Sequence, residues 1–182
     1  MAELALTRSS GDRRRYELDG IGTLRLGGWA SRWATAEAGG RTWGLARRGI
    51  LKSVIQATDP AGTVVGEFEG RTLKRGGGLR WEEHEYLLRP DSRWKEHYAL
   101  ADGDRTLARL EGKGWGKRPV RVEVDDDATL DPGLLLFAAF VVRALAEDAS
   151  SAEPATASCT PTGGSSAPRS AKLAYVGVQF SG

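Results

Sequence analysis

The feature that most constrains the fold is an apolar run near the end of the sequence, "LLLFAAFVV" at residues 134–142. Asp131 is a good helix N-cap and Pro132 suits the first helical position, so the sequence predicts a helix over residues 131–147. Arg143 is the first interruption, and the run therefore covers more than two consecutive turns without a polar face. A helix that is apolar on every side must be enclosed on every side, by lipid or by protein.

The length of this run favours protein over lipid as its surroundings. A helix that spans a bilayer needs roughly 20 apolar residues, whereas residues 134–142 provide nine without interruption. We therefore predict no transmembrane segment. The only material that can enclose the helix is then the part of the chain that precedes it.

Residues 14–124 read as a succession of short strands. Runs of alternating or β-branched residues are separated by Gly-Gly, Asp-Gly and Asp-Pro turns, as in "TLRLGGW", where Leu24 and Leu26 share one face and Arg25 the other. We count about eleven or twelve such runs at the spacing expected of a sandwich or barrel. About twelve antiparallel strands can close around a helix. The predicted fold is mainly β: a closed or nearly closed antiparallel barrel that encloses the C-terminal helix.

The sequence predicts one domain with two flexible ends. Residues 1–12 are expected to be a flexible N-terminus, 13–148 the barrel with its central helix, and 149–182 a disordered tail rich in Ala, Ser, Thr, Pro and Gly. The last ten residues, "LAYVGVQFSG", could form one more strand or remain outside the barrel. The single cysteine and the absence of a signal-peptide pattern predict a cytoplasmic protein, with peripheral membrane attachment as a further option.

This layout resembles the tubby C-terminal-like superfamily, which includes the tubby proteins, the plant LURP-one-related proteins and the phospholipid scramblases. The resemblance covers residues 14–148 and is carried by the strand series followed by "DPGLLLFAAFVVRALAED". It implies the barrel with a central helix, and bacterial members of unknown function are the nearest relatives it suggests. Tubby domains bind phosphoinositides, but no local motif of this sequence matches their headgroup-binding residues, so no site is carried over.

Motifs for catalysis or metal binding are weak. His84 and His97 lie in strand-like, glutamate-rich segments that offer too few converging ligands for zinc. "EGKGWGKRPV" at residues 111–120 lacks the spacing and the hydroxyl of a phosphate-binding loop, and Asp125–Asp127 lacks the spacing of an EF-hand and is explained by support for the helix start. We therefore predict no catalytic residue, metal site or cofactor, and nothing positive indicates an enzyme.

Charge is nearly balanced overall but unevenly placed. The chain has 26 Lys and Arg against 24 Asp and Glu, a balance that does not favour a nucleic-acid partner. Residues 1–80 contain 14 basic and 8 acidic side chains, whereas residues 81–148 contain 10 and 15. Such asymmetry can create one basic face on the folded molecule.

A basic face of the barrel is the predicted ligand-binding site. Its candidate residues are Arg47, Arg48, Lys52, Arg71, Lys74 and Arg75. The primary hypothesis is a non-enzymatic binding module for anionic phospholipid headgroups or another acidic ligand. The alternatives are a protein-interaction scaffold with an unknown partner and, less favoured, an enzyme with an unrecognised pocket. Strand-end arginines also solubilise a β-surface and discourage edge pairing, and this reading stays open at the level of sequence.

Overall fold

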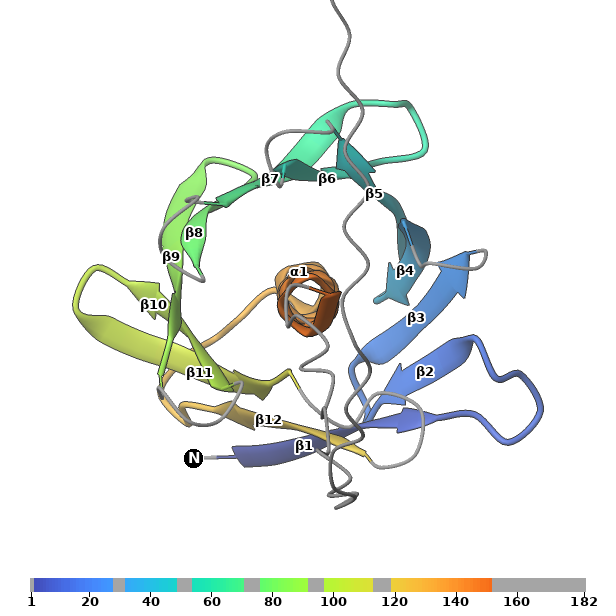
Figure 1. Ribbon diagram of the computed structural model, residues 1–182, viewed down its shortest axis with the longest axis horizontal. Coiled ribbons are helices and arrows are strands. Elements are labelled where there is room, and N and C mark those ends of the chain that lie inside the picture. Colours follow the sequence, from blue (N-terminus) through green and yellow to red (C-terminus); the bar gives the residue numbers. More distant parts are fainter. Residues whose placement is uncertain are drawn as a thin grey trace, which may run out of the picture.

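The computed structural model describes residues 2–27, 32–48, 54–70, 76–91, 97–112 and 119–151, which form twelve strands and one helix (Figure 1). The elements are β1 (Ala2–Arg8), β2 (Arg15–Leu18), β3 (Gly22–Gly27), β4 (Trp33–Ala38), β5 (Arg41–Arg48), β6 (Val54–Thr58), β7 (Val64–Gly70), β8 (Gly77–Trp81), β9 (His84–Pro90), β10 (His97–Asp102), β11 (Arg105–Glu111), β12 (Val120–Val124) and α1 (Pro132–Ser151).

Each strand pairs antiparallel with its neighbours in sequence, and β1 pairs with β12 to close the barrel. The two-residue alternation decides which side chains enter the core. In β4, for example, Ala34, Ala36 and Ala38 are buried while Trp33 and Glu37 on the other face are exposed. The prediction of a closed antiparallel barrel of about twelve strands is confirmed.

The N-terminal boundary of the barrel was predicted wrongly. Residues 1–12 were expected to be flexible, but β1 starts at Ala2 and lies between β12 and β2, with Leu4 opposite Val122 and Leu6 opposite Leu18. Leu6 is fully buried. The reason is closure itself: without β1, strands β2 and β12 would each leave a row of unpaired backbone groups.

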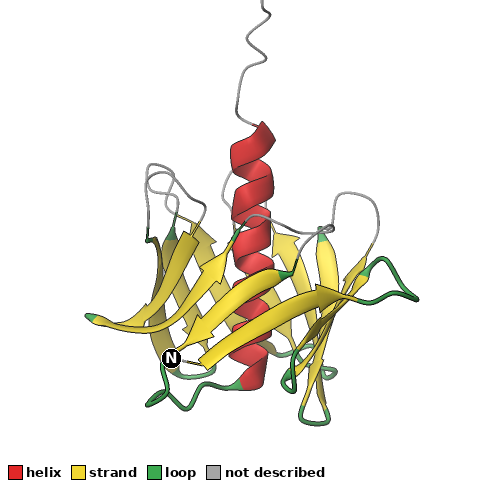
Figure 2. Cartoon of the chain, turned by 90° about the horizontal axis from the view of Figure 1, so that it is seen from below, coloured by secondary structure: helices red, strands yellow, loops and turns green. Residues whose placement is uncertain are grey.

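The helix α1 runs through the middle of the barrel (Figures 1 and 2). It extends four residues beyond the predicted end at residue 147. No residue from Leu134 to Val142 is more than 3% exposed, so the apolar run at residues 134–142 is enclosed by the strands on every side. Each large side chain buried in this way contributes about 1.5–3 kcal/mol. Among the described residues, no helix is long and apolar enough to cross a membrane.

The helix is not equidistant from all strands. Its most extensive strand contacts are with β4, whose inner face carries only the alanines Ala34, Ala36 and Ala38. Elsewhere the wall fills the interior with large side chains, including Phe68 and Tyr98. The small residues of β4 let the helix lie close to this wall, and larger side chains from other strands occupy the interior on the other sides.

The start of the helix is packed against two tryptophans. Trp43 and Trp81 meet edge to face with ring centroids 5.7 Å apart, and Trp81 also lies 5.6 Å from Phe137. Gly133 fits between them: a Cβ atom there would come within 2.6 Å of the Trp81 ring and 2.8 Å of the Trp43 ring. The glycine is therefore required by space, because no other residue lets the helix start this close to the indoles.

Because the strands alternate in direction, successive connections lie at opposite ends of the barrel (Figure 2). Loops 19–21, 39–40, 59–63, 82–83, 103–104 and 125–131 lie at the end where α1 begins. Loop 9–14 lies at the other end, together with Arg32, Arg48 and the C-terminal turn of α1. The charged residues of the loops therefore lie at one of these two ends.

Candidate functional site

The end of the barrel where the helix begins is strongly acidic. Its six loops and the strand residues that flank them contain ten carboxylates and two arginines. The carboxylates are Asp19, Asp59, Glu82, Glu83, Asp102, Asp104, Asp125, Asp126, Asp127 and Asp131, and the arginines are Arg41 and Arg105. We call this set the acidic end.

Several of these groups fix the start of the helix. The Asp131 carboxylate accepts hydrogen bonds from the backbone N–H groups of Gly133 (2.7 Å) and Leu134 (3.1 Å), which is N-capping. Arg41 donates to Glu82 at 2.7 Å and to Asp131 at 3.4 Å, and its guanidinium lies 5.0 Å from the centre of the Trp43 ring. The hydrogen bond to Glu82, aided by the charge of Asp131, raises the pKa of Arg41. The acidic end therefore has a structural role.

The triple aspartate also has a local partner. Arg105 donates two hydrogen bonds to Asp125, from Nη2 at 2.9 Å and from Nε at 3.2 Å, and these lower the pKa of the Asp125 carboxyl.

The acidic end also affects a neighbouring tyrosine. Burial, followed by the nearby charges of Asp102, Asp131 and Glu82, raises the pKa of the Tyr86 hydroxyl. Within the described ranges, no group of three or more His, Cys, Asp or Glu side chains is placed to hold a metal ion.

Neither histidine forms a catalytic pair with a nucleophile from the described part of the chain. His84 is exposed, with its ring 6.4 Å from that of Tyr86, and the His97 imidazole lies 4.0 Å from Glu111. The segment 113–118, which contains most of the glycine-rich stretch considered as a phosphate-binding loop, lies outside the described residues, as do the tail from residue 152 onward and its last ten residues.

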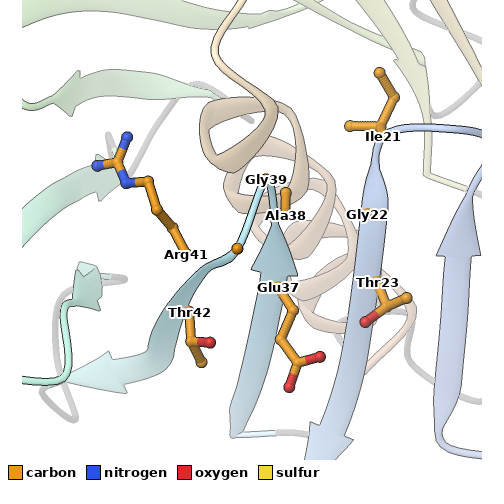
Figure 3. Close-up of a pocket in the computed structure, with 9 residues that line it drawn as sticks. Ile21, Gly22, Thr23, Glu37, Ala38, Gly39, Arg41 and Thr42 are labelled. Atoms are coloured by element: carbon orange, nitrogen blue, oxygen red, sulfur yellow. The ribbon is translucent and has the colours of Figure 1, made fainter.

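Two shallow hollows are present on the described surface. The larger, of about 330 Å³, lies at the acidic end between β3, β4 and β5 (Figure 3). Thr23, Glu37 and Thr42 line it, while the Arg41 side chain extends away from Glu37. The smaller, of about 230 Å³, lies on the outer wall of β7, β8 and β9 and contains Glu67, Glu69 and Arg80. No hydrogen bond links a hydroxyl of either hollow to a carboxylate among the described residues, so neither hollow provides a recognisable catalytic arrangement.

The opposite end of the barrel has the opposite charge. In the described part of its connections and their flanking residues, six arginines face three carboxylates: Arg8, Arg13, Arg14, Arg15, Arg32 and Arg48 against Asp12, Asp91 and Glu111. Glu147 and Asp148 add two carboxylates at the end of α1. We call this the basic end. The sequence between its strands also contains nine Lys or Arg and one Glu in residues that the structure does not describe.

The predicted site residues divide into three groups. Lys52, Arg71, Lys74 and Arg75 lie outside the described residues. Arg47 shares the inner face of β5 with Trp43 and Leu45, and its guanidinium binds Asp148 at the end of α1, so it is engaged in holding the helix. Arg48, on the other face, is exposed to solvent at the basic end. The structure therefore separates two neighbours that the sequence grouped together.

Five exposed arginines at the basic end form no side-chain ion pair with a carboxylate in the described part of the chain: Arg8, Arg13, Arg14, Arg32 and Arg48. Four of them, Arg13, Arg14, Arg32 and Arg48, lie at the basic end of strands β2 to β5. The backbone brings their positions together. Leu26 N–H donates to the Arg14 carbonyl at 2.8 Å, and Arg47 N–H donates to the Arg32 carbonyl at 2.9 Å. Neighbouring strands are about 4.8 Å apart, so the backbone from β2 to β5 spans roughly 15 Å. We call these four residues the basic arc.

An exposed tryptophan lies within the basic arc. Trp33 directly follows Arg32, and 55% of its surface is exposed, whereas Trp43 and Trp81 are 2% and 3% exposed. Trp33 is paired with Gly27 of β3 and with Ala46 of β5. Strand alternation alone does not say which face of a strand is inside, so the sequence does not distinguish the exposed Trp33 from the buried Trp43 and Trp81.

A signal for the two charged ends was present in the sequence. In an up-and-down barrel, alternate connections belong to the same end. Taken together, the odd-numbered connections contain more Arg and Lys than Asp and Glu, whereas the charged residues of the even-numbered connections are Asp and Glu. Summing charge over the two halves of the chain mixes these sets, which is why it revealed an asymmetry but not its direction in space.

Comparison with known proteins provides no family for this chain: no family model, no curated protein and no solved structure matches it. The function must therefore be argued from the charges and contacts described above.

Proposed function

We propose that the protein is a non-enzymatic binding module whose basic arc binds an anionic ligand, with phospholipid headgroups as the ligand class. The observation that carries the proposal is that Arg13, Arg14, Arg32 and Arg48 are exposed and their guanidinium groups have no carboxylate partner among the described residues, while most carboxylates of the barrel ends lie at the other end. An unpaired guanidinium presents several N–H donors in a planar fork that matches phosphate oxygens.

The charge separation supports binding to an extended anionic surface. A basic residue near such a surface contributes about 1 kcal/mol of attraction, so several together give substantial affinity. The acidic end is repelled by the same surface. Attraction at one end and repulsion at the other orient the molecule before contact, which increases the rate of productive encounters.

The competing explanation is that these arginines only solubilise the barrel and protect strand edges. A closed barrel has no free sheet edge to protect. Solubility alone is served equally well by charges of both signs spread over the surface, and it does not account for their sorting to opposite ends. The resemblance to the tubby-like superfamily points to the same ligand class and remains a prediction.

The test compares two variants of equal net charge in a vesicle co-sedimentation assay. In the arc variant, Arg14, Arg32 and Arg48 are replaced by Gln. In the control variant, Arg80, Arg105 and Arg121, which pair with Glu67, Asp125 and Glu3 away from the arc, are replaced by Gln. We expect the original chain to bind phosphatidylserine-containing vesicles more tightly than pure phosphatidylcholine vesicles.

The arc variant is expected to lose about a hundredfold in affinity for the anionic vesicles, whereas the control variant should change by only a few fold. Circular dichroism spectra and thermal melts establish that both variants keep the barrel. Equal losses in the two variants, or binding that does not depend on anionic lipid, would contradict the proposal.

A further inference from the structure

Trp33 is held in a fixed orientation on the outside of the barrel. Its ring lies over Gly27 on the neighbouring strand, so close that a Cβ atom at residue 27 would come within 2.0 Å of it. The other neighbour of Trp33 is Ala46, which is also small. Two small residues on the outer wall thus make room for the indole, which keeps more than half of its surface in solvent.

Trp33 lies beside exposed arginines, and this combination suits contact with a membrane surface. Indole is amphipathic, and tryptophan side chains concentrate at the boundary between headgroups and hydrocarbon. Trp33 follows Arg32 directly, and β5 beside it ends in Arg48. Stable attachment to a membrane surface usually requires two signals, such as apolar insertion together with a basic patch. The basic arc and Trp33 supply one of each on the same side of the barrel.

The combination of an exposed apolar ring with cationic side chains fits an extended anionic surface better than a small soluble anion, which offers no apolar layer for the indole. The Trp33 ring lies on the outer surface of the barrel wall, over Gly27, with 55% of the residue's surface exposed. A single-stranded nucleic acid is usually held by several stacked aromatic rings along a groove, and Trp33 is the exposed tryptophan among the three that the structure describes.

We infer that Trp33 is the membrane-interface anchor of the basic arc, and that the barrel docks on an anionic bilayer by its β2–β5 side with the acidic end directed away from the lipid. This inference rests on the proposed function. It adds that the anionic groups belong to a bilayer, that Trp33 is the residue that inserts into it, and that the acidic end is directed away from it.

The first experiment tests the anchor with vesicles of phosphatidylcholine and phosphatidylserine. Replacing Trp33 by Ala removes a large apolar contact at the interface, and we expect a loss of about tenfold in partitioning. Val64→Ala is the matched control, because Val64 is also a large exposed hydrophobic residue (40%) but lies where β7 starts, at the acidic end. That variant should bind like the original chain. Equal effects of the two substitutions, or no effect of Trp33→Ala, would overturn the anchor.

The second experiment tests the orientation. In a Cys159→Ser background, one fluorophore is attached at Ser10→Cys in loop 9–14 of the basic end, and another at Ala61→Cys in loop 59–63 of the acidic end; both positions are exposed. Vesicles that contain nitroxide-labelled lipid should quench the label at residue 10 and leave the label at residue 61 unchanged. Equal quenching, or stronger quenching at residue 61, would contradict docking with the acidic end directed away from the lipid.

The outcomes separate this inference from the proposed function. If the arc variant loses vesicle binding while Trp33→Ala does not, anion binding by the arc stands and the anchor is wrong. If the chain binds inorganic polyphosphate but not vesicles, the partner is not a bilayer. The same conclusion follows if it binds a single-stranded oligonucleotide through Trp33 but not vesicles. If it binds neither vesicles nor polyphosphate, both proposals fail.

Discussion

At the scale of single residues, space around the helix start outweighs intrinsic helix propensity. Glycine inside a helix is normally about 1 kcal/mol less favourable than alanine. At residue 133 this preference is overridden, because a methyl group would meet the rings of both Trp43 and Trp81 below 3 Å. The indoles are themselves fully enclosed and cannot swing into solvent.

We therefore predict that Gly133→Ala destabilises the protein by about 1–3 kcal/mol, the usual cost of overpacking a core. Gly78→Ala is the matched control: it lies in β8, has no positive φ, and an added Cβ would meet nothing within 4 Å. That change should be neutral or slightly stabilising. Urea denaturation monitored by tryptophan fluorescence measures both. A Gly133→Ala variant as stable as the original would show that the helix start is less tightly packed than described.

The same scale explains why the candidate site was only partly predictable. The two-residue period of β5 already places Arg47 on the face of Trp43 and Leu45, and Arg48 on the other. What the period cannot supply is the partner of Arg47, because Asp148 is about a hundred residues away and meets it only once the helix has passed through the barrel. For Trp33 the period leaves two faces possible, and burial of the alanines of β4 against α1 decides between them.

At the scale of elements, the fold depends on the fit between a helix with large apolar side chains and strands whose inward-facing side chains differ in size. Most of this could be predicted: the apolar run required enclosure, and the alternating segments supplied the strands. The missed element is β1, whose pairing depends on β12 more than a hundred residues later. Closure contacts of this kind leave no local signature beyond the alternation of Leu4 and Leu6.

The inner face of β4 gives a direct test of this matching. We predict that Ala36→Leu destabilises the barrel by about 1–3 kcal/mol, because Ala36 is fully buried on the wall closest to the helix and the added carbons have no space. Thr35→Leu on the outer face of the same strand adds comparable volume toward solvent and should change stability by less than about 0.5 kcal/mol. Thermal melts of the two variants provide the comparison, and similar losses in both would refute the proposed close contact between β4 and α1.

At the scale of the whole molecule, the main property is charge sorted between two ends of one barrel. The sorting is invisible in the net charge of +2 and only partly visible in the two halves of the chain. It appears when connections are assigned to ends by the up-and-down topology. Carboxylates of the acidic end have a structural role at the helix start, because Asp131 and Glu82 both accept hydrogen bonds from Arg41. The guanidinium groups of the basic arc form no such contact with a carboxylate in the described structure.

Binding of an anionic ligand at the basic end can be measured by titrating the ¹⁵N-labelled protein with inorganic polyphosphate and recording NMR spectra. We predict that amide shift changes cluster at residues 12–15, 32–33 and 47–48, and that they are absent from loops 59–63, 82–83 and 103–104. The changes should weaken as salt is added, because exposed charges are screened. Shift changes centred on the acidic end or scattered evenly over the outer wall would contradict this prediction.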